Sequence, residues 1–341
     1  MIYLANKKGD GVVGDLHYET SRLFEAVERL TDIVHRTPCK QSQTLNEWTG
    51  SEVYLKLENL QKTGSFKIRG AFNKIAQLTE QECSRGLIAA SAGNHAQGVA
   101  LAGRERGIPV TIYMPVTTPE TKVSATRKYG ALVKLVGQNF DESYIAAREE
   151  QLATGASFIH PFDDLAVIEG QATVAMEMLQ RHPEMDTIVV PAGGGGLLAG
   201  TALAVKTVRP SVKVIGVQAA NSPAIFTDYN GGQNNNVPFL PTIAEGICVK
   251  KPGKLTMDII HNYVDGMVTV TEQEISATIL FMLEREKLLV EGAAAAAISA
   301  VMNKKLPVQS KKTGVIVSGG NFDLSKLSEC MSMNTTSVQN F

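Results

Sequence analysis

Short apolar segments alternate with longer amphipathic segments along most of this 341-residue chain, and this alternation limits the possible folds more than any other feature. The short segments are rich in Val, Ile and Leu, which is typical of strands buried inside a sheet. The segments between them repeat apolar residues three or four positions apart, which predicts helices. Strands that alternate with helices form parallel sheets with helices on both faces. The sequence therefore predicts an α/β protein with two parallel-rich sheet domains.

The same patterns predict where the elements lie. The expected strands are 53–57, 87–91, 109–114, 132–136, 156–160, 187–191, 213–218, 267–271 and 314–318. The expected helices are one that starts near Thr20 and stops before Pro38, one that starts at Lys67, and 94–106, 117–129, 140–153, 165–181, 197–208, 273–288 and 291–303. Residues 1–18 show no such period and are expected to be loosely held. Residues 221–266 interrupt the alternation and predict a long surface excursion.

Composition and charge exclude several classes of protein. The formal net charge of −1 gives no electrostatic reason to expect nucleic acid or an anionic membrane as a partner. No apolar run reaches the roughly 20 residues that span a bilayer, and the start of the chain has no signal-peptide pattern. The four cysteines form no CxxC pair, so we expect a cytoplasmic protein without a structural metal site.

Ligands of parallel sheets bind where the strands end, so the residues after each strand matter most. Four consecutive glycines, Gly193–Gly196, follow the strand 187–191 and precede a helix. Such a turn lets the backbone approach a bulky anion, most naturally a phosphate. The spacing also fits a dinucleotide fingerprint, but no acidic residue follows until Asp228. The turn therefore predicts a site for a smaller phosphorylated ligand.

Two other strand ends carry polar turns. Ser91-Ala92-Gly93-Asn94-His95 opens a helix whose first backbone N–H groups would be free to bind a carboxylate. A plain turn with a helix cap is the alternative, and a structural role for His95 is favoured over a catalytic one. Ser318-Gly319-Gly320-Asn321 places a hydroxyl where it could meet the edge of a planar ring. An ordinary turn would have the same residues.

One lysine, Lys67, indicates what chemistry these turns could serve. Lys67 lies between Phe66 and Ile68, just inside a predicted helix for which Gly64-Ser65 supplies the turn and the N-cap. Its amine is either held in water at the end of a packed stem or desolvated and put to use. A lysine together with a phosphate-binding turn suggests a Schiff base to a phosphorylated aldehyde, namely pyridoxal phosphate.

The motifs SFKIRGA, SAGNHAQG, GGGGL and SGGN, in this order, closely resemble those of the fold type II (β-family, tryptophan synthase β-like) pyridoxal-phosphate enzymes. Within that family the chain is similar to the catabolic threonine dehydratases, or threonine ammonia-lyases, and more distantly to serine racemases. The resemblance runs from about residue 20 to residue 328. It implies a large catalytic domain of residues 1–75 and 159–341, and a small mobile domain of residues 76–158 that bears the asparagine loop.

The resemblance also implies a role for each motif residue. Lys67 would form the Schiff base and later remove the Cα proton, and Ser318 would face the pyridine nitrogen. Phe66 would pack against the cofactor, and Asn94 would bind its 3′ oxygen. The phosphate would be held by Gly193, Gly194, Gly195, Gly196 and Leu197. The substrate carboxylate would be bound by the loop of Ser91, Ala92, Gly93, Asn94 and His95.

The activity implied by the resemblance is β-elimination from a small hydroxy amino acid. L-Threonine would give 2-oxobutanoate and ammonia, and L-serine would give pyruvate as a secondary reaction. A neutral hydroxyl at Ser318 favours an unprotonated pyridine ring, and thus elimination over transamination. Relatives of this kind further imply amino-acid catabolism with a link to isoleucine biosynthesis, a homodimer or homotetramer, and allosteric control by a nucleotide such as AMP.

Three alternatives stay open. Two are enzymes of the same fold, a serine racemase and a hydroxyaspartate ammonia-lyase, and the third is a phosphate-ligand sensor without chemistry. Racemases place a second serine where this chain has Ala92, so racemisation should be weak. The carboxylates of their divalent-cation site would fall near Gln218 and Ala224, so no metal is expected.

Three features at the edges of the motifs add further expectations. Only 20 residues (341 − 321) follow Asn321, so no C-terminal regulatory domain is expected. The segment His160–Asp164 is expected to start a helix near the cleft, with a structural role favoured over catalysis. Glu291 opens an alanine-rich helix and either interacts with the helix dipole or reaches the cofactor ring.

Overall fold

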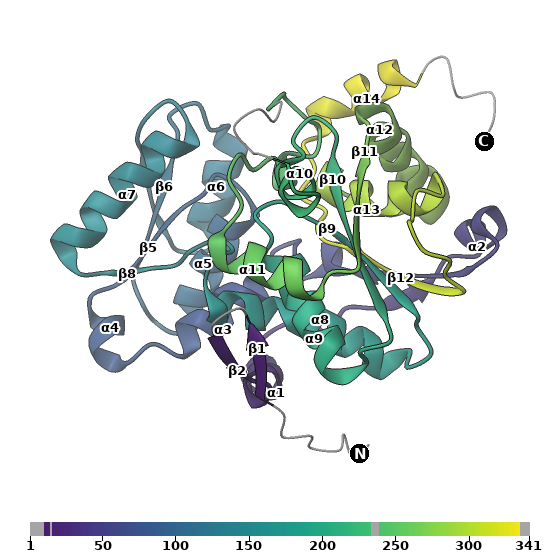
Figure 1. The fold of residues 1–341 in the computed structure, drawn as a ribbon. Coiled ribbons are helices and arrows are strands. Elements are labelled where there is room, and N and C mark those ends of the chain that lie inside the picture. Colours follow the sequence, from purple (N-terminus) through teal and green to yellow (C-terminus); the bar gives the residue numbers. More distant parts are fainter. Residues whose placement is uncertain (1–9, 14–15, 233–238, 335–341) are drawn as a thin grey trace.

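The computed structural model describes residues 10–13, 16–232 and 239–334, and their ribbon forms two α/β units side by side (Figure 1). The smaller unit is built on a four-stranded parallel sheet in the order β7-β6-β5-β8. Its strands are β5 (Leu87–Ala90), β6 (Val110–Met114), β7 (Leu132–Leu135) and β8 (Ser157–Phe158). Its helices are α4 (Glu80–Ser84), α5 (Asn94–Glu105), α6 (Glu120–Lys128) and α7 (Phe140–Thr154).

The larger unit is built on a six-stranded sheet in the order β11-β10-β9-β12-β4-β3. All neighbours are parallel except the edge strand β3, which is antiparallel to β4. Its strands are β3 (Cys39–Gln41), β4 (Glu52–Leu57), β9 (Thr187–Pro191), β10 (Lys213–Ala219), β11 (Gly266–Val270) and β12 (Lys312–Val317). A separate antiparallel pair is formed by β1 (Asp10–Val13) and β2 (Leu16–Glu19).

Helices cover both faces of the six-stranded sheet. Helices α8 (Leu165–Arg181) and α9 (Gly196–Val208) pack on one face, and α12 (Glu272–Phe281) and α13 (Gly292–Met302) pack on the other. The alanine-rich helix α13 is buried along its length, because small side chains let it lie close to the sheet. The remaining helices are α1 (Ser21–Leu30), α2 (Gln43–Thr49), α3 (Lys67–Ala76), α10 (Ala224–Tyr229), α11 (Lys254–Tyr263) and α14 (Leu327–Met333).

The predicted α/β class is confirmed, and most strands and helices lie within a few residues of their expected bounds. The first helix is an exception, because α1 ends at Leu30 and not at the expected stop of residues 35–38. Three other local predictions were wrong. Residues 221–266 are not one irregular excursion, because they contain α10, a 3₁₀ turn (η3, Glu245–Ile247) and α11. Ser65 does not cap α3, since the residue before the helix is Phe66 and no side chain caps it. The helix expected at 273–288 ends at Phe281 and continues as a π turn, Met282–Glu286.

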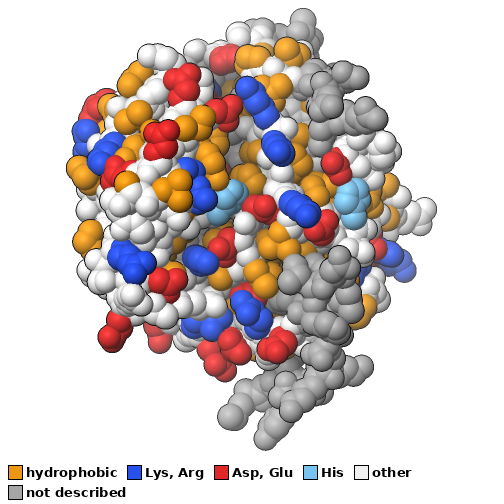
Figure 2. All heavy atoms as spheres, turned by 60° about the vertical axis from the view of Figure 1, so that its left-hand side comes forward, with side chains coloured by type: hydrophobic (Ala, Val, Ile, Leu, Met, Phe, Trp, Pro, Cys, Tyr) orange, Lys and Arg blue, Asp and Glu red, His pale blue; other side chains and the backbone are white. Residues whose placement is uncertain are grey.

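Of the N-terminal segment expected to be loosely held, residues 10–13 and 16–18 belong to the β1–β2 pair, and 1–9 and 14–15 lie outside the described residues. Among the helices that the structure describes, none combines the length and apolarity needed to cross a membrane. On the face shown in Figure 2, lysine and arginine side chains are interspersed with aspartate and glutamate, so neither sign of charge dominates it.

Candidate active site

The four-glycine turn joins the end of β9 to the start of α9. Gly195 precedes the helix in the left-handed region, with φ of 97°. Within the described residues, the backbone N–H groups of Gly193, Gly194, Gly195, Gly196 and Leu197 have no hydrogen-bond partner. A row of free N–H groups at a helix N-terminus is a ready anion site.

Side chains would not fit at this turn. A Cβ atom at Gly194 would lie 2.2 Å from the ring of Phe162, and one at Gly196 would lie 3.0 Å from the same residue. A Cβ at Gly195 would lie 2.8 Å from the side chain of Thr256, whose hydroxyl donates to the carbonyl of Gly194 (2.8 Å). Phe162 and Thr256 therefore pack tightly against the turn, while its backbone N–H groups remain unpaired.

Lys67 is the first residue of α3. Its Nζ donates to the carbonyl oxygen of Pro161 at 2.9 Å and lies 5.2 Å from the centre of the Phe66 ring. Pro161 directly precedes Phe162, the residue packed on the glycine turn, so the amine lies on the side of that turn. Burial lowers the pKa of Lys67 to about 8, although the charge of Glu291 opposes this shift. Of the two alternatives for this lysine, the structure supports the desolvated amine.

The segment that follows β12 lies antiparallel to the residues before Lys67. The Phe66 N–H donates to the carbonyl of Ser318 (3.1 Å), and the Gly320 N–H donates to the carbonyl of Gly64 (2.9 Å). Ser318 is only 2% exposed, and its hydroxyl has no partner among the described residues. This contact fixes the Ser318 hydroxyl beside the lysine loop and leaves it free for a ligand.

Asn94 joins the two units at the start of α5. Its side-chain Nδ2 lies 2.9 Å from each carboxylate oxygen of Glu291, the residue before α13. Its Oδ1 accepts a hydrogen bond of 2.7 Å from Asn321. Burial raises the pKa of Glu291 to about 7, against the opposing effects of Asn94 and Lys67. Glu291 makes no capping hydrogen bond of its own, so the sequence identified this residue but not its partner.

His95 is held inside the protein. Its Nε2 lies 2.8 Å from the carbonyl of Ile159, and burial lowers its pKa to about 3, so the ring is neutral and Nε2 is the donor. This geometry supports the structural role expected for its side chain. Within the described residues, its backbone N–H has no partner, as is also true of those of Ala92 and Asn94, and its buried Nδ1 has none either. The Ser91 hydroxyl is used locally, since it accepts from the Gly93 N–H (3.2 Å).

The segment His160–Asp164 does start a helix, because the Asp164 side chain caps α8. His160 Nδ1 accepts hydrogen bonds from two backbone N–H groups of its own turn, and burial lowers the pKa of His160 to about 4. The turn thus fixes the carbonyl of Pro161 that holds the Lys67 amine. The sequence offered no sign that a proline carbonyl would play this part.

A buried network of charged side chains anchors α3, the helix that begins at Lys67. The sequence did not predict this network. The Arg69 guanidinium, 0% exposed, binds Glu58 through two bonds of 2.8 Å and Glu177 through bonds of 2.7 and 3.1 Å. Lys56 donates to the same Glu177 (2.6 Å) and to the carbonyl of Thr37 (2.7 Å). A lysine in the middle of the apolar run VYLKL was the available signal. Removing one of these side chains would leave a buried charge without its partner, which is strongly destabilising. The network therefore holds α3 in place.

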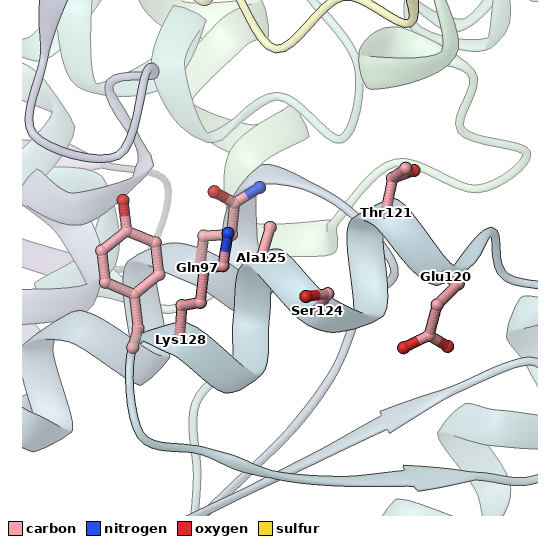
Figure 3. Close-up of a pocket in the computed structure, with 7 residues that line it drawn as sticks. Gln97, Glu120, Thr121, Ser124, Ala125 and Lys128 are labelled. Carbon is pink, nitrogen blue, oxygen red and sulfur yellow. The ribbon is translucent and has the colours of Figure 1, made fainter.

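Two other features lie outside this cluster. In the described part of the chain, no three His, Cys, Asp or Glu side chains are grouped so that they could hold a metal ion. A cavity of about 750 Å³ opens along α6, and its lining shares no residue with the cluster around Lys67 (Figure 3). It is lined by Gln97, Glu120, Thr121, Ser124, Ala125, Lys128 and Tyr129.

The fold and this arrangement together define a class. The site combines a desolvated lysine, a glycine turn whose backbone N–H groups are unpaired, and a free hydroxyl, all at the carboxyl edge of a parallel sheet. These groups fit pyridoxal phosphate, as in fold type II enzymes. A model of the family described as pyridoxal-phosphate dependent enzyme matches residues 30–319. The chain therefore belongs to this family, and its predicted cofactor and fold are confirmed.

Individual relatives agree with this assignment. L-Threonine ammonia-lyase of Thermotoga maritima is 52% identical over 303 residues, which are 89% of this chain and 75% of that protein. The catabolic L-threonine dehydratase TdcB of Escherichia coli is 41% identical over 317 residues, which are 92% of this chain and 96% of that protein.

Solved structures show the same fold. The processed form of threonine deaminase isoform 2 from Solanum lycopersicum has a TM-score of 0.88 and 33% identity, covering 97% of this chain and 92% of that one. Serine racemase from Dictyostelium discoideum has a TM-score of 0.83 and 35% identity, covering 89% of this chain and 98% of that one.

Proposed function

We propose that this enzyme is a threonine ammonia-lyase that converts L-threonine to 2-oxobutanoate and ammonia, and L-serine to pyruvate as a secondary reaction. The observation that carries the proposal is the desolvated amine of Lys67, bound to the Pro161 carbonyl next to the unpaired glycine turn. Relatives at 41–52% identity that are named for this activity support the choice of substrate.

The residues of the site fit the cofactor as follows. The glycine turn and the Leu197 N–H would hold the phosphate, Lys67 would carry the cofactor covalently, and the free hydroxyl of Ser318 would bind the ring nitrogen. Phe66 would pack on the ring, and Asn94 would bind the 3′ oxygen. When bound, pyridoxal phosphate supplies an electron sink that makes the Cα–H bond of the amino acid acidic.

The chain's own residues then bind the substrate and move its protons. The free N–H groups of the Ser91–His95 loop would hold the substrate carboxylate at the start of α5. Lys67, displaced by the substrate amine, would take the Cα proton, and its pKa of about 8 suits a base that works near neutral pH. Because the Ser318 hydroxyl carries no charge, it would leave the ring nitrogen unprotonated, which favours elimination over transamination.

The amine of Lys67 should react as a neutral nucleophile at an unusually low pH. Below its pKa the amine is protonated and cannot attack an aldehyde, so covalent capture of pyridoxal phosphate by the apoenzyme should rise with pH and level off above a midpoint of about 8. Stopped-flow absorbance measures the rate, with N-α-acetyl-lysine as the control. A midpoint equal to that of the free lysine derivative would refute the burial of the amine.

Serine racemase activity is the second candidate, because a serine racemase is among the structural relatives. Ala92, half-buried in the loop before α5, has no group that could move a proton. We expect the wild-type enzyme to form little D-serine from L-serine, and Ala92→Ser to raise D-serine formation about tenfold or more. Chiral chromatography measures both. Wild-type racemisation as fast as elimination would instead favour the racemase.

Several parts of the proposal rest on the resemblance alone. They are the division into a large domain (1–75 and 159–341) and a small mobile domain (76–158), a homodimer or homotetramer, a nucleotide effector such as AMP, and a role in isoleucine supply. A cytoplasmic location rests instead on the cysteine pattern. Light scattering tests the assembly, and assays with and without AMP test the effector.

Oxoacid release from a panel of hydroxy amino acids tests the proposed function. L-Threonine should be turned over, with L-serine as a slower substrate. Preference for 3-hydroxyaspartate would favour the hydroxyaspartate ammonia-lyase. Binding of pyridoxal phosphate with no turnover of any substrate would favour the sensor.

A further inference from the structure

Glu291 is hydrogen-bonded to Asn94, but the proposed function gives it no role. Its carboxylate accepts both hydrogen bonds from the Asn94 amide, although the two residues are 197 positions apart in the chain. It also lies directly against the segment after β12, since a Cβ atom at Gly319 would be 2.5 Å from Glu291 Oε1. Glycine at this position is what leaves room for the carboxylate.

The hydrogen-bond chain around Asn94 has only one possible direction. Asn321 Nδ2 donates to the Thr63 carbonyl (2.8 Å) and to Asn94 Oδ1 (2.7 Å), and Asn94 Nδ2 then donates to Glu291. A carbonyl and an ionised carboxylate can only accept hydrogen bonds, so both ends of the chain are fixed while Glu291 is ionised. The two amides between them cannot flip without losing bonds at each end.

We propose that Glu291 is a positioning residue, whose carboxylate orients the Asn94 amide and thereby docks the start of α5 onto the cofactor site. The proposal rests on the cofactor-binding part of the function above, because Asn94 is the residue expected to bind the cofactor's 3′ oxygen. Glu291 holds the Nδ2 of that amide on the side of α13, and Asn321 holds its oxygen on the other side. It also links α5 of the smaller unit to α13 of the larger unit.

The charges around Glu291 are consistent with this role. Lys67 of α3 and Lys122 of α6 favour its ionised form, and Glu245 of the η3 turn opposes it. Lys122 is itself bound to Glu245 (2.9 Å), so Lys67 is the cation left for Glu291 on the cofactor side. The carboxylate therefore interacts with two of the groups that are expected to touch the cofactor, Asn94 and Lys67.

Glu291→Gln is the decisive variant, because a glutamine has almost the same shape but only one acceptor, and its own amide repels that of Asn94. Two readouts use the apoenzyme: hydrogen exchange of the first turn of α5, and the dissociation constant for pyridoxal phosphate. We expect faster exchange at Asn94–Gln97 and an affinity about tenfold weaker or more. Glu291→Asp should restore part of both, since it keeps the carboxylate.

Two further measurements separate positioning from other roles. Glu274→Gln, in the first turn of the neighbouring helix α12, is the matched control and should change neither readout. In the holoenzyme, Glu291→Gln should raise KM for the amino acid more than it lowers kcat, because α5 bears the carboxylate-binding loop. If exchange at α5 and cofactor affinity both match the wild type, the proposal is wrong. These apoenzyme readouts stand even if L-threonine proves not to be the substrate.

Discussion

Replacing Lys67 by alanine is expected to abolish oxoacid release from L-threonine, with a loss on the order of 10⁴-fold or more. The substitution removes both the amine that carries the cofactor and the base that takes the Cα proton, and each function alone contributes strongly to rate. A coupled assay that reduces 2-oxobutanoate measures the effect. The fold should survive, because the Arg69 network that anchors α3 is untouched.

A matched control makes this result specific. Lys62 is exposed and lies in the turn before α3, five positions before Lys67, so Lys62→Ala removes a nearby lysine without touching the Pro161 carbonyl. It should retain near wild-type turnover. Oxoacid release from Lys67→Ala at the wild-type rate would show that another group does the chemistry.

Replacing Gly195 by alanine is expected to weaken binding of pyridoxal phosphate by about tenfold or more. An alanine there is strained by about 1–3 kcal/mol because φ is 97°. Its Cβ would also lie 2.8 Å from the Thr256 side chain, so the turn must shift and its N–H groups lose their common direction. Titration of the apoenzyme with pyridoxal phosphate gives the dissociation constant directly.

Gly107→Ala is the control for backbone strain alone. Gly107 also has a positive φ, 66°, but a Cβ there would meet nothing within 4 Å, and it lies in the turn after α5. It should lower thermal stability without changing cofactor affinity. Equal affinity of Gly195→Ala and the wild-type apoenzyme would contradict the assignment of the glycine turn as the phosphate site.

The sequence predicted most of the fold because hydrophobic period and strand length are local properties. It failed where local signals were weak. Helix α11 has an apolar side, but Gly253 begins it without a side-chain cap, and it follows a stretch rich in turn residues. Helix α2 has both Ser42 as a cap and Gly50 in the left-handed region, yet its seven residues are too few to show a period.

The candidate site was predictable in outline for a topological reason. Parallel strands end at the same edge, so motifs that follow different strands were expected to meet, and Lys67, the glycine turn and Ser318 lie together there. The contacts between them were not predictable. The Pro161 carbonyl that holds Lys67 is 94 positions away, and Asn94 and Asn321 are 227 positions apart. Such pairings depend on tertiary packing, which no local pattern encodes.

Identifying the lysine that carries the cofactor tests the central claim most directly. The purified holoenzyme would be reduced with borohydride, digested and analysed by mass spectrometry, which fixes the cofactor to the residue that holds it. The structure predicts one pyridoxyl group, on the peptide that contains Lys67. A modified lysine elsewhere, or no modified lysine in an active preparation, would contradict the account.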